Sequence, residues 1–318
     1  MLLTSAILHA ILLIDWERKQ VINGKREGAN MENKINDLKT ASEVLIEKGL
    51  DFSVKGSPIY DNNGQELSEF KAIQREDNGH TFQVAKKGYQ IIQNSDALSL
   101  MDEVVGTGMA KYSDANSYKN GGIVSVRVKL PFDYEVVKGD EVNTYLDLLT
   151  SHDGSKSLSI NLYELRLVCL NGMRAMVRTK AINCRHTVNY RLKIEQAQEM
   201  FEEYRQIFQA KKENYQRLAK SPMNGNDLDT FLNTLLNIKE DKEVFAKTQN
   251  VKDTLTKLFV SGKGNNFASG SKWSAFNAVT EYVNYHRTTK GDESNREFSS
   301  LYGSGNVMTQ NALELLSV

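Results

Sequence analysis

The sequence predicts an α+β fold, with a mixed or mainly antiparallel sheet body up to about residue 190 and a helical C-terminal part. Three observations indicate this class. Tight-turn signals separate short alternating segments before residue 190, which is typical of hairpins. Only one helical pattern lies among those segments, so the strand–helix alternation of a doubly wound sheet is missing. From Arg191 onward, apolar residues recur at helical spacing.

Up to residue 105 the sequence predicts two helices and three short strands. Asp77-Asn78-Gly79 is a strong tight-turn signal between two strand-like segments. Gly49 stands where a helix would end, and Asn94 or Ser95 can cap the start of the next helix. The expected elements are a helix over Asp37–Lys48, strands over Glu69–Gln74, Thr81–Ala85 and Tyr89–Gln93, and a helix over Asp96–Val105.

The clearest strand covers Ile123–Leu130, where valines alternate with Ser125, Arg127 and Lys129. This alternation predicts one buried face and one basic, solvated face. Two more strands are expected at Tyr145–Leu149 and Leu158–Leu162, on either side of an Asp-Gly turn.

The helical part begins with a long amphipathic pattern from Arg191 that Ser221-Pro222 ends. Further helices are expected over Asp227–Leu236 and Lys242–Phe259, and a last one carries Trp273, Phe276, Val279 and Val283. We therefore divide the chain into a sheet domain (31–190), a helical region packed on it (191–290) and a loosely held polar tail (291–318).

Residues 1–30 are expected to be a mis-called or disordered extension. The apolar segment Leu2–Ile14 is shorter than a membrane span, which needs about 20 residues, and it lacks the features of a signal peptide. Lys25-Arg26-Glu27-Gly28 can be encoded by a purine-rich stretch that resembles a bacterial ribosome-binding site. Met31 is then the expected start.

The bulk composition argues against a protein with a large net charge and against one held together by several disulfides. Lys+Arg 40 balances Asp+Glu 40, so no global field draws the molecule to nucleic acid or to an anionic membrane. Two cysteines, Cys169 and Cys184, are too few for a disulfide framework and fit a reducing compartment. We expect a cytoplasmic protein with no membrane contact.

The most informative feature is a segregation of charge. Between Glu164 and Glu195 there is no acidic residue, while seven cations lie in that interval. Cations interspersed with aromatic residues are typical of surfaces that bind a phosphate backbone and stack bases. The alternative is a solvated basic face balanced by nearby acidic residues. The predicted nucleic-acid contacts are Arg166, Arg174, Arg178, Arg185, Arg191 and Lys193, extended across the sheet by Arg127 and Lys129.

A second candidate site contains His152 and Asp153, with Cys169, Asn171 and His186 downstream. These residue types could hold a metal or form a nucleophilic pair, but the spacing matches neither CxxC nor HExxH. The alternative is structural: an Asp-Gly turn, a core cysteine and hydrogen-bonding histidines. No catalytic residue, metal ligand or cofactor is predicted.

Five groups of residues follow one another in an order that resembles a known family: Gly88–Asn94, Ser151–Ser155, Arg166 with Cys169-Leu170-Asn171, Arg185-His186-Thr187, and Trp273 with Asn277–Tyr282. The chain is similar to the phage/plasmid-like family called domain of unknown function 932, from about Leu50 to His286. The resemblance implies occurrence in phages, plasmids and integrative elements, sometimes near genes for single-strand binding and annealing. It implies no activity and no catalytic residues.

The leading hypothesis is a non-enzymatic nucleic-acid-binding accessory protein of phage or plasmid replication or recombination, with single-stranded DNA as the favoured partner. His152, Asp153, Asn171 and His186 would line its cleft. One alternative is a metal-dependent nuclease or hydrolase that uses His152, Asp153 and His186. Another is a protein that binds a host factor through the helical part. Assembly as a homo-oligomer is compatible with each hypothesis.

Overall fold

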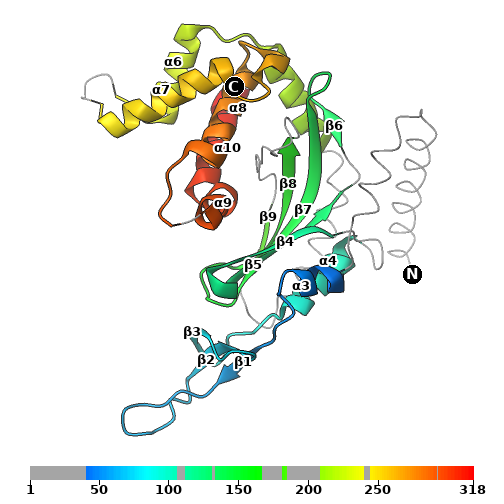
Figure 1. The fold of residues 1–318 in the computed structure, drawn as a ribbon, viewed down its shortest axis with the longest axis vertical. Helices are drawn as coiled ribbons and strands as arrows, with labels where there is room; N and C mark the ends of the chain where they lie inside the picture. Colours follow the sequence, from blue (N-terminus) through cyan, green and yellow to red (C-terminus); the bar gives the residue numbers. More distant parts are fainter. Residues whose placement is uncertain are drawn as a thin grey trace, which may run out of the picture.

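The computed structural model describes residues 41–105, 112–130, 133–166, 181–184, 208–239, 244–291 and 293–318. Two antiparallel sheets come first in the chain and helices follow them, so the predicted α+β class is confirmed (Figure 1). Within these ranges no helix is both long enough and apolar enough to cross a lipid bilayer. The predicted extension, residues 1–30, lies outside the described residues.

A small sheet forms from three short strands after helix α3 (Ala41–Glu47): β1 (Val54–Ser57), β2 (Phe70–Arg75) and β3 (Thr81–Lys86), in that order. The β2–β3 hairpin was predicted, and its turn holds Gly79 at a φ of +70°. Figure 1 shows this sheet projecting from one end of the molecule.

The strand expected at Tyr89–Gln93 is wrong, because this segment is irregular. Side chains replace the missing backbone pairing. The amide of Gln93 accepts a hydrogen bond from Val54 N (2.9 Å) and donates one to Val54 O (2.7 Å). The Tyr89 hydroxyl donates to Ser151 O at 3.0 Å. The segment thus connects the two sheets without belonging to either.

The large sheet has the strand order β4-β5-β7-β8-β9, with β6 paired to β7, and every neighbouring pair is antiparallel. The predicted strands are confirmed, and two of them are longer than expected. The bounds are β4 (Tyr112–Tyr118), β5 (Ile123–Lys129), β6 (Tyr134–Glu135), β7 (Glu141–Ser151), β8 (Leu158–Arg166) and β9 (Ala181–Cys184).

One face of the large sheet packs against α3 and α4 (Asn94–Val105). Val124, Val126 and Leu146 are fully buried there, together with Met101 of α4. Alternation along β5 predicted this apolar face. Burial of such side chains is the main stabilising term in folding, at about 25 cal/mol for each Å² removed from water.

The opposite face of β5 is not solvated, so this part of the prediction is wrong. Ser125 and Arg127 are 0% and 3% exposed. Helix α9 (Glu293–Tyr302) covers this face, where Leu301 packs against Tyr145. Lys129 at the end of the strand is partly exposed, and its ammonium lies 3.0 Å from the carboxylate of Asp133.

The helical part begins, within the described residues, with a helix over 208–220 that ends at Ser221-Pro222 as predicted. The predicted helices are confirmed with small shifts in their bounds. Two of these helices begin with a capping box, formed by Asn224 with Asp227 in one and by Ser271 with Ser274 in the other. The bounds are α6 (Gly225–Leu235), α7 (Ala246–Ser261), η3 (Asn265–Ala268), α8 (Lys272–Glu281) and η4 (Tyr282–His286).

The tail after Gly291 is not loosely held, which corrects the prediction. It forms α9 and α10 (Ser304–Ser317), and α10 packs beside α8 (Figure 1). Leu301, Ala312 and Leu316 are at most 2% exposed. The segment is polar on average, but α10 has one apolar face. Ala312 and Leu316, four residues apart, both lie on this face and belong to the core.

Candidate functional site

A buried ion pair joins the large sheet to the helical part. Arg166 on β8 donates from Nε and from Nη2 (2.6 Å) to the two carboxylate oxygens of Asp140. The indole Nε1 of Trp273 donates to the same carboxylate at 2.8 Å, and Gly264 O accepts from Arg166 Nη2 at 3.0 Å. Asp140 and Arg166 are 0% and 2% exposed. The predicted contact of Arg166 with phosphate is therefore wrong, since its charge is buried and compensated.

Glu164, two residues before Arg166 on the same face of β8, forms a second buried ionic centre. Its carboxylate pairs with Lys211 and accepts hydrogen bonds from the hydroxyls of Tyr215 (3.0 Å) and Tyr134 (3.2 Å). Burial lowers the pKa of Lys211, and the negative charge of Glu164 acts against this shift. The last acidic residue before the basic interval thus already has a cationic partner.

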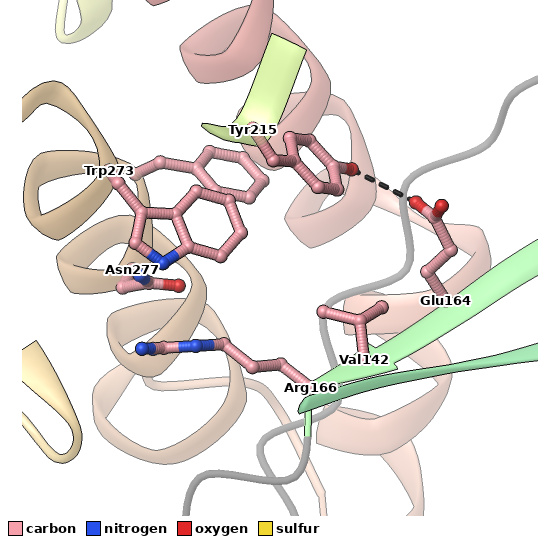
Figure 2. Close-up of a pocket in the computed structure, with 7 residues that line it drawn as sticks. Val142, Glu164, Arg166, Tyr215, Trp273 and Asn277 are labelled. Carbon is pink, nitrogen blue, oxygen red and sulfur yellow. Dashed lines mark hydrogen bonds between the residues drawn. The ribbon is translucent and has the colours of Figure 1, made fainter. Parts of the chain in front are cut away.

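A small cavity lies between these two ionic centres. In Figure 2, Arg166 extends from β8 toward Trp273 and Asn277 on α8. The cavity measures about 10 Å³, which is room for about one water molecule and not for a substrate. Both polar side-chain atoms of Asn277 are buried there with no hydrogen-bond partner among the described residues. The lining residues are Val142, Glu164, Arg166, Tyr215, Trp273, Phe276 and Asn277.

His152 has a structural position at the junction of the two sheets. Its Nε2 lies 3.0 Å from Oδ1 of Asn94, and its ring lies 5.9 Å from that of Phe52 and 5.5 Å from that of Phe82. The backbone oxygen of His152 accepts from Gln83 Nε2 at 2.8 Å. At 1% exposure this imidazole cannot line an open cleft, which corrects the prediction.

Asp153 builds the turn that follows. It pairs with Lys119 at 3.0 Å and accepts a hydrogen bond from Ser155 N at 2.9 Å. Burial acts to raise the pKa of Asp153, but the hydrogen bonds from Ser155 and Lys119 outweigh it and hold this pKa below its usual value. Gly154 completes the turn at a φ of +70°.

His152 and Asp153 therefore have different partners and do not form the core of a metal site. Among the residues that the structure describes, no three His, Cys, Asp or Glu side chains are grouped so that they could hold a metal ion. The nuclease hypothesis also requires His186, which lies outside the described residues together with Asn171.

A polar layer lies between β5, β7 and α9. Arg127 Nε donates to Asp147 Oδ1 at 3.0 Å, and its guanidinium also lies 3.5 Å from Asp114 and 3.9 Å from Glu297. The hydroxyl of Tyr302 on α9 donates to Asp147 at 2.9 Å. Arg127 thus faces carboxylates and not solvent, so its predicted contact with nucleic acid is wrong.

This layer predicts a pH dependence of stability. Burial, and then the charge of Asp147, raise the pKa of Tyr302 well above its usual value. Above pH about 10 the unfolded chain ionises this tyrosine while the folded protein keeps it protonated, so stability falls as the pH rises. The loss is about 1.4 kcal/mol per pH unit for one such group. Urea unfolding between about pH 9 and about pH 11 measures it.

The Tyr302→Phe variant is the control for this measurement. Its stability should be lower at neutral pH, by about 1–3 kcal/mol, because Asp147 loses a buried donor. It should lose less stability with rising pH than the unchanged chain does. Equal pH dependence in the two proteins would contradict the assignment.

The remaining predicted contacts lie outside the described residues: Arg174, Arg178, Arg185, Arg191 and Lys193. The interval that contains them starts at the end of β8 and includes β9, the last strand in the order of the large sheet. Sequence reasoning included Asp140 among the nearby acidic residues that could balance the basic face, but it missed the acidic partner Asp147. A signal for Asp147 was present, because it stands between leucines in a buried strand.

Comparison with known proteins gives one match. The family model "Domain of unknown function (DUF932)" matches residues 81–302, more than half of the 318-residue chain. No curated protein and no solved structure matches. The matched range begins with β3 and ends with Tyr302. It contains His152 with its partners Phe82 and Asn94, both buried ionic centres and the polar layer under α9. The chain belongs to the family of domain of unknown function 932.

Proposed function

We propose that this protein binds nucleic acid as a non-enzymatic accessory factor of phage or plasmid replication or recombination. The observation that carries the proposal is the acid-free interval between Glu164 and Glu195. One of the seven cations in this interval, Arg166, is paired with Asp140. The other six remain as candidate phosphate contacts, and the interval itself contains no acidic residue. A cation density of this kind attracts a phosphate backbone regardless of sequence.

The arrangement of the acidic residues supports the same proposal. If the interval were only a solvated basic face, nearby carboxylates would have to balance it. Asp140 balances one cation of the interval, Arg166, whereas Asp133 is paired with Lys129 and Glu164 with Lys211. These carboxylates are therefore already used by cations other than those at positions 174–193.

The position of β9 also supports the proposal. This strand lies within the basic interval and stands next to β8 at one end of the strand order. Lys180 directly precedes this strand in the sequence and Arg185 directly follows it, so two cations of the interval flank a strand at the end of the order. The family resemblance implies a genomic setting for the proposal: phages, plasmids and integrative elements, sometimes near genes for single-strand binding and annealing.

The salt dependence of DNA binding tests the proposal. Replacing Arg178 and Arg185 by Ala should weaken binding to all sequences by similar factors. It should also lower the slope of log K against log salt by about one to two, since each phosphate contact contributes about 0.9 on a duplex and about 0.7 on a single strand. Fluorescence anisotropy with labelled single- and double-stranded DNA across a salt series measures both effects.

A matched control removes two cations from elsewhere. Lys247 and Lys257 are exposed on α7, so replacing both by Ala makes the same change in net charge. This variant should keep the slope of the unchanged protein. If both double variants alter the slope equally, the basic interval is not the site. If the unchanged protein does not bind at low salt, the proposal fails.

A further inference from the structure

The outward face of the small sheet carries an unusual set of side chains. Residues directly opposite each other in antiparallel strands point to the same face. The register places Phe70 opposite Lys86, Ala72 opposite Val84, and Gln74 opposite Lys55. The other face of these strands is turned inward, where Val54 and Ile73 are 3% and 0% exposed.

Two large apolar side chains stand on the outward face. Phe70, on the central strand β2, is 42% exposed, and Val84 on β3 is 55% exposed. The solvated face of an antiparallel sheet normally carries polar residues. An exposed phenyl ring on the central strand of a sheet offers a flat surface on which another ring can stack.

The charged residues within the three strands are all cations, one of which, Arg75, is paired with Asp77 in the β2–β3 turn. Strands β1, β2 and β3 contain four cations, Lys55, Lys71, Arg75 and Lys86, and no acidic residue. Lys55 and Lys86 belong to the outward face and are exposed. The ammonium of Lys55 lies 3.9 Å from the carboxylate of Glu76, and both side chains are about half exposed, so this pair contributes little.

We propose that single-stranded nucleic acid lies across this face, with one base stacked on Phe70 and its phosphates beside Lys55 and Lys86. The inference rests on the proposed function and adds a second contact surface to it. An exposed ring flanked by cations, with no carboxylate on the strands, favours a polyanion with accessible rings. Unpaired bases can stack on a protein ring, whereas the bases of a duplex are stacked on one another.

The Phe70→Leu and Phe70→Tyr variants separate stacking from apolar contact. Leucine keeps an apolar side chain and loses the ring, whereas tyrosine keeps the ring. Stacking of one base contributes about 1–3 kcal/mol, which is about 5- to 150-fold in affinity. We expect Phe70→Leu to weaken binding of a fluorescein-labelled oligothymidylate at least about fivefold, and Phe70→Tyr to change it less than about twofold.

Two comparisons make the result specific. The Phe245→Leu variant changes another exposed phenylalanine, 83% exposed before α7, and should bind the oligothymidylate like the unchanged protein. A duplex should bind Phe70→Leu and the unchanged protein equally well. Thermal unfolding of Phe70→Leu should match that of the unchanged protein, because the side chain lies at the surface.

The outcomes distinguish this inference from the proposed function. If Phe70→Leu binds the oligothymidylate as tightly as the unchanged protein, the inference is overturned and the basic interval keeps its proposed role. Equal weakening on single strands and duplexes also overturns it. If the unchanged protein binds no nucleic acid, both proposals fail together, whatever the variants do.

Discussion

Deletion of residues 291–318 is expected to abolish cooperative folding. The deletion removes α9 and α10 and with them the buried side chains of Leu301, Ala312 and Leu316. Burial of a leucine contributes about 1.5–3 kcal/mol, so these contacts approach the total stability of a typical protein, about 5–15 kcal/mol. Circular dichroism during heating should show a broad transition or none.

Two neighbouring leucines on α10 give a finer form of this test. Leu316 is 2% exposed and Leu315 is 38% exposed. Leu316→Ala should lower the free energy of unfolding by about 2–5 kcal/mol. Leu315→Ala should cost clearly less, because most of its contacts are at the surface. A sharp transition at an unchanged temperature in the deleted chain, or equal costs for the two leucines, would show that the C-terminal helices are dispensable.

The Asp140→Asn variant is expected to be destabilised by about 3–5 kcal/mol, the cost of leaving a buried charge without its partner. Arg166 would keep its positive charge in a site that is 2% exposed, and it would lose the carboxylate that accepts two of its hydrogen bonds. The midpoint of urea unfolding measures the change. The Asp140→Leu/Arg166→Met double variant should recover part of the loss, because it removes both buried charges.

The control for this prediction is the partly exposed ion pair between Lys129 and Asp133, whose side chains are 28% and 21% exposed. Asp133→Asn should cost less than about 1 kcal/mol, since water screens the remaining charge. Similar costs for Asp133→Asn and Asp140→Asn would mean that burial does not distinguish the two pairs.

The strands and helices followed from local patterns, but the side of the sheet that faces water did not. Alternation along β5 separates Val124 and Val126 from Ser125 and Arg127, and this part of the prediction is confirmed. The pattern of polar residues is the same whether water or a covering helix faces them. Helix α9, which covers Arg127, is far from β5 in the sequence. A local pattern of residues in β5 therefore cannot predict that this helix packs over it.

The candidate site was harder to predict for the same reason. Arg166 and Asp140 are 26 residues apart, and Tyr302 is 155 residues after Asp147, so no spacing rule connects them. A cation in a strand can equally be a phosphate ligand or half of a buried pair. Only the folded structure shows that Arg127 and Arg166 belong to buried pairs. The acid-free interval, in contrast, can be recognised in the sequence alone.

The polar layer under α9 also has a consequence for how the protein is synthesised. A ribosome makes Asp147 and Arg127 long before it makes Tyr302, so the sheet has all its strands while its polar face still lacks its cover. Contacts over such sequence distances slow folding, and domains generally fold as units during synthesis. The face should therefore stay hydrated until α9 leaves the ribosome. Nascent chains that stop before residue 293 should then be more sensitive to protease than the complete protein.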